Sequence, residues 1–158
     1  MMCGLYHQIN YKDKSRLIDR GEGVFTLDGN DMPEEEYHIE IHDDLFRRFH
    51  DYFIWIETYN PVGPQEFNRG FNYYGWTEIR DENLVKFGKL IDSLLNLFEN
   101  APENIILTGD YCFDPPSHRG QYDRIKIKKD ELLKIFGDLK NMTVKAIKNN
   151  GYLSHSGI

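Results

Sequence analysis

Residues 37–44, with the sequence YHIEIHDD, contain the side chains best suited to metal chemistry. If this segment is a strand, His38, Glu40 and His42 point to one face, because successive side chains of a strand alternate. Two imidazoles and a carboxylate are suitable ligands for zinc or non-haem iron, with one position left open for water. Side chains two apart on one strand point in parallel, however, whereas metal ligands must converge. The pattern therefore favours an amphipathic strand with a polar face over a metal site.

A second polar group follows the apolar run NIILTG at residues 104–109. Asp110, Asp114 and His118 could gather at the end of this run as an acid and base group. Asp114 precedes two prolines, however, which is typical of a turn. We therefore expect these three to be turn residues at a loop that could contribute to binding.

Motifs of nucleophilic and cofactor chemistry are missing from the sequence. It has no Gly-x-Ser-x-Gly elbow, and the glycines of RGEG and RGFNYYG lack the spacing of a phosphate-binding loop. Its two cysteines, Cys3 and Cys112, stand in no CxxC pair, and we expect both to be free thiols of a cytoplasmic protein. We expect no cofactor, and the sequence favours a protein that is not an enzyme.

The most unusual stretch is RGFNYYGWTEIR at residues 69–80, which holds four aromatic residues. Read as a strand, it turns one set of side chains to the core, namely Phe71, Tyr73, Gly75, Thr77 and Ile79. The other face mixes large rings with charges, as interface hot spots do. Our candidate binding residues are the larger members of this face together with neighbouring loop residues: Tyr74, Trp76, Glu78, Arg80, Phe67, Asp110, Asp114 and His118. The alternative is that a loop or a helix covers Tyr74 and Trp76.

These residues must be positioned by a mixture of helices and short strands. Apolar residues at helical spacing predict a helix after Asp81, capped by its carboxylate, and a second from Asp130, in which Gly137 would allow a kink or break. Strands are expected in seven runs: LYHQINY, GVFTL, EYHIEIH, FNYYGWTEI, NIILTG, DRIKIK and YLSHSGI. Residues 44–58 fit either one helix capped by Asp43 or a helix followed by a strand, and we lean to the single helix. NPVGPQEFNRG and DYCFDPPSHRGQY are expected to be irregular segments outside the sheet.

The predicted fold class is α+β, with a mostly antiparallel or mixed sheet packed against two or three helices. A length of 158 residues fits a single globular domain over residues 1–158. The longest apolar runs are far shorter than the roughly 20 residues that a membrane helix needs, so we expect no membrane partner.

Charge gives the strongest indication of a partner. The chain carries −7, of which residues 121–158 contribute +4 and residues 1–120 contribute −11. Such an acidic surface disfavours nucleic acid and suits a basic protein. We therefore expect a small protein-binding module, such as an inhibitor or an immunity-like protein that acts on a basic partner.

Two other functions stay open. One is a small metal-dependent hydrolase that uses His38, Glu40 and His42 with Asp110. The other is a regulatory or structural subunit that associates with copies of itself, and the sequence leaves the oligomeric state undetermined.

Overall fold

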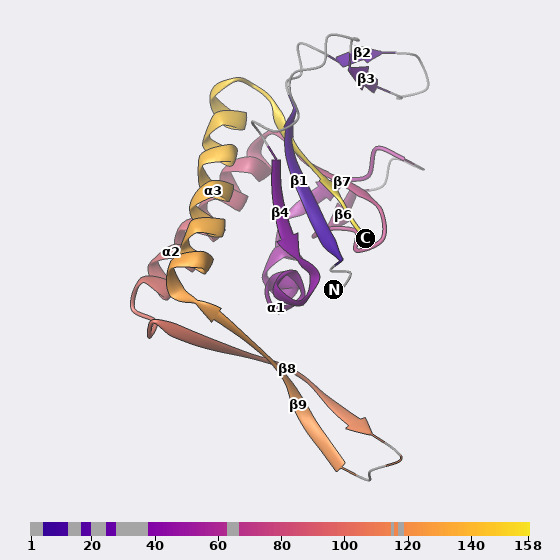
Figure 1. Cartoon of the computed structure of the whole chain (residues 1–158). Helices are drawn as coiled ribbons and strands as arrows, with labels where there is room; N and C mark the ends of the chain where they lie inside the picture. The colour runs from indigo at the N-terminus through magenta and orange to yellow at the C-terminus, as the bar shows by residue number, and fades with distance from the viewer. Residues whose placement is uncertain are drawn as a thin grey trace.

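The predicted α+β class is confirmed: in the described part of the chain, three helices accompany a six-stranded antiparallel sheet and two two-stranded ribbons (Figure 1). The computed structural model describes residues 5–12, 17–19, 25–27, 38–62, 67–114, 116 and 119–158. The helices are α1 (Asp43–Phe53), α2 (Glu82–Glu99) and α3 (Lys129–Lys148). The strands are β1 (Tyr6–Lys12), β2 (Leu17–Asp19), β3 (Phe25–Leu27), β4 (His38–His42), β5 (Glu57–Tyr59), β6 (Phe67–Arg69), β7 (Trp76–Ile79), β8 (Asn104–Asp114), β9 (Arg119–Lys128) and β10 (Tyr152–Ser156).

The six-stranded sheet has the strand order β4-β1-β10-β7-β5-β6. β10, close to the end of the chain, lies between β1 and β7, so that Gln8 is opposite Ser156 and Leu153 is opposite Ile79. β5 joins the sheet through the pairing of Tyr59 with Glu78. β1 and β10, which are far apart in the sequence, therefore pair with each other inside the sheet.

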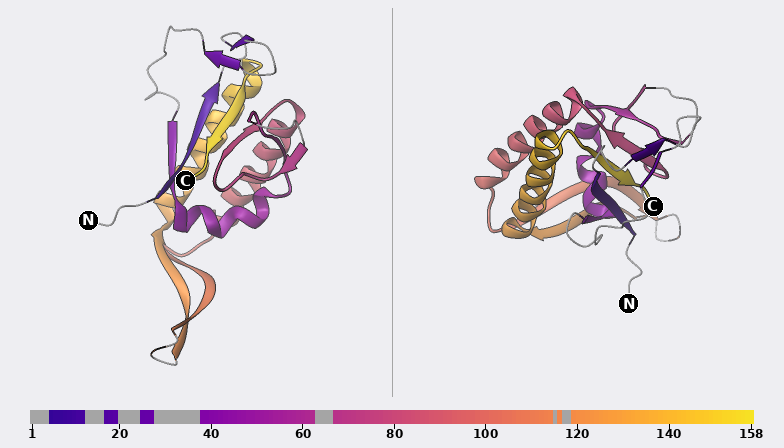
Figure 2. Two further views of the ribbon diagram at one scale, coloured as in Figure 1. Left: turned by 90° about the vertical axis from the view of Figure 1, so that its right-hand side faces the viewer. Right: turned by 90° about the horizontal axis from the view of Figure 1, so that it is seen from above.

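The core lies between this sheet and the helices. α2 and α3 pack against each other, and α3 lies on β1, β4 and β10 (Figures 1 and 2). Phe46, Phe87 and Phe136 supply one large buried ring from each helix. Because each helix presents its apolar stripe to the others or to the sheet, this shared burial provides the main stabilising term.

Residues 44–58 form a helix followed by a strand, so the single helix that we favoured is wrong. α1 ends at Phe53, and β5 begins four residues later at Glu57. The N-cap of α1 is His42, whose Nδ1 accepts a hydrogen bond from the Asp44 backbone N–H, and Asp43 is the first helical residue instead. Gly70 explains the tight return of the chain after β6: its φ is +69°, and a Cβ there would lie 2.9 Å from Ile54 Cα.

Both segments predicted to be irregular contain strands. NPVGPQEFNRG includes β6, which pairs with β5, and DYCFDPPSHRGQY supplies the ends of β8 and β9. The strand predicted over residues 71–79 is shorter, because only Trp76–Ile79 is extended. α3 continues through Gly137, where the prediction allowed a break, and Asp81 makes no side-chain cap to α2.

β8 and β9 form a long ribbon that leaves the rest of the molecule, and we call residues 104–128 the arm (Figures 1 and 2). Near its base, Ile105 lies opposite Ile127 and Leu107 lies opposite Ile125, and these four side chains pack on the core. The register shifts between Thr108 and Tyr111. Beyond this bulge the two strands pair with each other, and within the described residues no third strand joins them.

Two further predictions concern the cysteine thiols and membrane-spanning helices. Cys112 is exposed on the arm with a free thiol, whereas Cys3 lies outside the described residues. None of the three helices has both the length and the apolar character that crossing a membrane would require, in the part of the chain that the structure describes.

Candidate functional site

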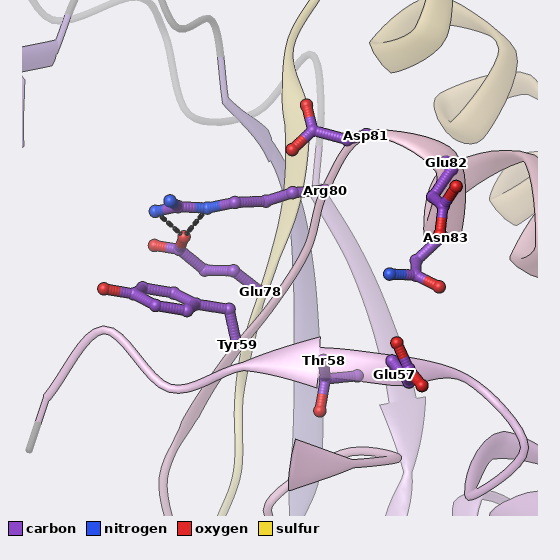
Figure 3. Close-up of a pocket in the computed structure, with 8 residues that line it drawn as sticks. All are labelled: Glu57, Thr58, Tyr59, Glu78, Arg80, Asp81, Glu82 and Asn83. Carbon is purple, nitrogen blue, oxygen red and sulfur yellow. Dashed lines mark hydrogen bonds and ion pairs between the residues drawn. The ribbon is translucent and has the colours of Figure 1, made fainter. Parts of the chain in front are cut away.

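A cavity of about 460 Å³ opens where β5 and β7 meet the first turn of α2 (Figure 3). Three short segments supply its lining residues, which are Glu57, Thr58, Tyr59, Glu78, Arg80, Asp81, Glu82 and Asn83. β5 and β7 meet because Tyr59 pairs with Glu78, and Arg80 and Asp81 then lead directly into α2. We call this cavity the acidic pocket, since it is lined by four carboxylates and one guanidinium.

Arg80 is held in place on one side of the acidic pocket. Its Nε donates to Glu78 Oε2 at 2.5 Å, and its Nη2 forms an ion pair with the same oxygen. The guanidinium carbon lies 4.4 Å from the centre of the Tyr59 ring and 5.2 Å from that of Tyr152, which are cation–π distances. Figure 3 shows the Tyr59, Glu78 and Arg80 side chains grouped together, apart from the residues that begin α2. Arg80 therefore compensates the most deeply buried carboxylate of the pocket.

Burial dominates the acid–base properties of this group. It raises the pKa of Glu78, and the opposing charge and hydrogen bond of Arg80 only partly offset the effect. Burial, followed by the nearby Glu78 charge, raises the pKa of Tyr152 to about 12. Removing Arg80 would leave a buried carboxylate without its cation, which is strongly unfavourable.

The remaining carboxylates of the pocket belong to Glu57, Asp81 and Glu82, which are all exposed. Asp81 and Glu82 stand at the start of α2, where the positive end of the helix dipole stabilises negative charge. Asp81 has a φ of 51°, an unusual conformation for a residue with a side chain. The arrangement can receive a positively charged group, because an incoming cation meets several carboxylates beside an aromatic ring.

A second polar cluster lies inside the core and links β1, α1, β10 and the turn before β7. His7 Nε2 lies 3.1 Å from Asp43 Oδ1, and His7 Nδ1 lies 3.0 Å from His155 Nε2. The Tyr73 hydroxyl donates to the same oxygen of Asp43. Phe46 stacks on both imidazoles. His7 is 0% exposed and His155 is 1% exposed, so neither imidazole is open to solvent.

The hydrogen bonds assign the tautomers of the two buried histidines. Burial lowers the pKa of His7 despite the favourable effect of Asp43, and burial lowers that of His155 to about 3. Both rings are therefore neutral at pH 7, each with one N–H. His7 donates from Nε2 to Asp43, so its Nδ1 must accept from His155 Nε2. This leaves His155 Nδ1 as a buried acceptor that has no hydrogen-bond partner within the described structure.

Asp43 is the charged member of this cluster. Burial alone would raise its pKa, but the hydrogen bonds from Tyr73 and His7 lower it overall. Tyr73 has a raised pKa, because it is partly buried and donates to Asp43. The cluster thus joins β1, α1, β10 and the turn before β7 through hydrogen bonds, apart from the unpartnered His155 Nδ1, while its imidazoles are shielded from any substrate in solvent.

The histidines predicted for metal chemistry lie on β4, at the edge of the sheet. Glu40 accepts a hydrogen bond from Gln8 Nε2 at 3.3 Å, and His42 caps α1. The side chain of His38 is outside the described structure. Asp110 lies on the arm with its carboxylate 3.6 Å from Arg47. Among the side chains that are described, no group of three or more His, Cys, Asp or Glu residues could hold a metal ion.

The predicted binding residues fall into separate places. Glu78 and Arg80 line the acidic pocket, and Glu78 is buried, although it was assigned to the exposed face. Tyr74 and Trp76 are 80% and 49% exposed. Asp110 is exposed on the arm. The side chains of Phe67 and Asp114 and all of His118 lie outside the described structure.

Two groups of exposed or site-forming residues were missed by the sequence analysis. Glu57, Tyr59 and Glu82 complete the acidic pocket, and the only local indication was the acidic run at residues 81–82. The exposed rings of the arm lay in a segment predicted to be a loop; they belong to Tyr111, Phe113 and Tyr122.

Comparison of the chain with protein-family models, with curated proteins and with solved structures found no match. Its function must therefore be argued from the geometry of these sites.

Proposed function

We propose that this protein binds a basic protein partner, and that the acidic pocket receives a lysine or arginine side chain from it. The observation that carries the proposal is the lining of the pocket. The lining contains four carboxylates, from Glu57, Glu78, Asp81 and Glu82, and one guanidinium, that of Arg80. A cavity of about 460 Å³ has room for one long side chain, and a positive charge there would reduce the excess of negative charge.

The position of Arg80 supports this assignment. Its guanidinium is already paired with Glu78 and stacked on Tyr59, so it neutralises the buried carboxylate and leaves the pocket with a net negative lining. Glu57 and Glu82 lie at the exposed part of the lining and suit contact with an arriving cation. Arginine fits such a place especially well, because its planar group can bind a carboxylate through two hydrogen bonds.

The charge of the whole chain supports the same kind of partner. Residues 104–128 carry +1, so the rest of the chain carries −8. A negative potential of this extent accelerates the encounter with a basic protein and disfavours acidic competitors. An inhibitor or immunity-like protein that covers a basic enzyme would have these properties.

The experiment is capture of partners from the native host lysate by the full chain, with identification by mass spectrometry. Glu57→Lys/Glu82→Lys reverses two charges of the pocket. We expect the wild type to enrich a basic protein in low salt, and the variant to bind that protein roughly ten- to hundredfold more weakly, with most of the loss removed when salt screens the charges.

The matched control is Glu99→Lys/Glu103→Lys, which makes the same change in net charge at and beyond the other end of α2. This control should retain most of the affinity. Equal losses in both variants would show that only overall charge matters, and capture of an acidic partner or of nucleic acid would contradict the proposal.

A further inference from the structure

We infer that the arm binds a second copy of this chain, with its basic and aromatic face lying on the acidic body of that copy. This inference goes beyond the proposed function and does not depend on the acidic pocket. It rests on the shape of the arm, on the side chains of one of its faces, and on the distribution of charge between the arm and the rest of the chain.

The arm is held firmly only at its base. Arg48 of α1 is nearly buried and forms an ion pair with Asp123 of β9. Gly109 of β8 lies against the same guanidinium, so closely that a Cβ at this position would collide with it. The outer part projects past the body in Figure 1 and in the left view of Figure 2. The arm is therefore anchored in a defined direction and leaves both faces of its outer half uncovered by the described chain.

One face of the arm combines apolar and basic side chains. Residues directly opposite each other in the ladder share a face, and Ile106 lies opposite Lys126 while Tyr111 lies opposite Tyr122. Alternation along β9 then places Arg124 on this face between Tyr122 and Lys126. The same alternation adds Phe113 and Lys128, whose ladder partners are Gly120 and Asn104. The face thus carries three basic side chains and, within the described residues, no acidic one.

The apolar members of this face are poorly protected from water. Ile106, Tyr111, Phe113 and Tyr122 are each more than half exposed. A two-stranded ribbon is only marginally stable by itself in water, and contiguous exposed apolar surface of this kind marks an interaction site. Tyr111 and Tyr122 contact each other edge to face, which leaves much of both rings available to a partner.

Charge complementarity identifies the occupant as a second copy. The basic face extends from a chain whose remaining residues carry −8 in sequence, so every copy combines this basic face with an excess of acidic residues elsewhere in its chain. A two-fold arrangement would let each copy place its arm on the other, and every contact would occur twice.

The area is sufficient for a stable dimer. The four exposed apolar side chains offer about 100 Å² each, if half of a large side chain is free. Two arms then offer about 800 Å², and covering them with an equal area of the partners gives about 1,600 Å², which is a standard interface.

The test is sedimentation velocity of the purified full chain from low to high micromolar concentration. We expect the wild type to reach twice the monomer mass and to dissociate as salt is raised, because the contact is partly electrostatic. A wild type that stays monomeric throughout would overturn the inference.

Two variants locate the contact. Tyr111→Ser/Phe113→Ser/Tyr122→Ser should raise the dimer dissociation constant at least about 30-fold, as expected when hot-spot rings are removed. Arg124→Glu/Lys126→Glu keeps every aromatic ring and should also weaken the dimer. This variant tests the contact independently if the first variant fails to fold. Dimerisation unchanged in both variants would overturn the inference.

Leu97→Ser is the control, because Leu97 is a similarly exposed apolar residue on α2. It should leave the dimer intact, and loss of the dimer in this variant would move the interface to the helix and overturn the inference. A single-stranded oligonucleotide provides the remaining comparison. Binding of this probe by a monomeric wild type, lost in Arg124→Glu/Lys126→Glu, would assign the face to nucleic acid and would also overturn the inference.

Discussion

The buried histidine cluster predicts a loss of stability in mild acid. His155 has a pKa of about 3 in the folded chain because burial disfavours its charged form, against 6.5 in the unfolded chain. Because the folded pKa is depressed, the unfolded chain binds protons first as the pH falls below 6.5, and stability is lost from there down to the folded pKa. Between pH 7 and pH 5, this difference in the pKa of His155 lowers the free energy of unfolding by about 2 kcal/mol.

Other groups act in the same pH range. The lowered pKa of His7 adds to the loss, whereas the raised pKa of Glu78 opposes it, because the folded chain then takes up a proton more readily than the unfolded chain. The substitution His155→Gln removes the contribution of His155 to the pH dependence of the free energy of unfolding. Glu78 is present in both proteins, so its contribution cancels when the variant is compared with the wild type. Glutamine does not titrate, and its amide can still donate to His7 Nδ1.

The assay is urea unfolding at pH 7 and at pH 5, with the free energy of unfolding extrapolated to water. We expect the decrease between the two pH values to be about 2 kcal/mol smaller in His155→Gln than in the wild type. The same decrease in the wild type and in His155→Gln would refute the assignment of His155 as a neutral buried group.

Two further predictions test the exposed aromatic stretch and the anchor of the arm. Trp76→Ala should reduce the free energy of unfolding by less than about 1.5 kcal/mol, since the ring is half exposed; a loss of about 3–5 kcal/mol in a denaturant melt would instead show that Trp76 belongs to the core. Gly109→Ala should cost about 1–2 kcal/mol, because the new Cβ displaces the Arg48 guanidinium from Asp123. The same substitution in an Arg48→Met background should cost clearly less, and equal costs in a double-mutant cycle would exclude this mechanism.

Part of the alternation in residues 69–80 could be predicted because it is local. Phe71, Thr77 and Ile79 were expected in the core and are buried, although Phe71 lies before β7. The arm was predicted only at its base, where strands were expected in NIILTG and DRIKIK. The prolines and glycines between these runs suggested a loop, but most of that segment is strand, and the bulge after Thr108 interrupts the alternation along β8.

The sites were harder to predict because they depend on contacts between distant segments. Glu78 is two residues from exposed Trp76 on the same strand and was therefore expected on the same exposed face, but β5 pairs beside it and Arg80 forms an ion pair with it. His7 and His155 are 148 positions apart, so no local pattern could join them. The sequence analysis named two residues that line the acidic pocket, Glu78 and Arg80, but it placed them on an exposed aromatic face.

The most direct test of the central claim is hydrogen exchange of the full chain with and without its captured basic partner. The account predicts that the partner slows exchange at residues 57–59 and 78–84, which contain the lining of the acidic pocket. The slowing should disappear in Glu57→Lys/Glu82→Lys and persist in Glu99→Lys/Glu103→Lys. Protection confined to the arm, or to the exposed rings of Tyr74 and Trp76 with none at the pocket, would contradict the claim that this pocket receives the partner.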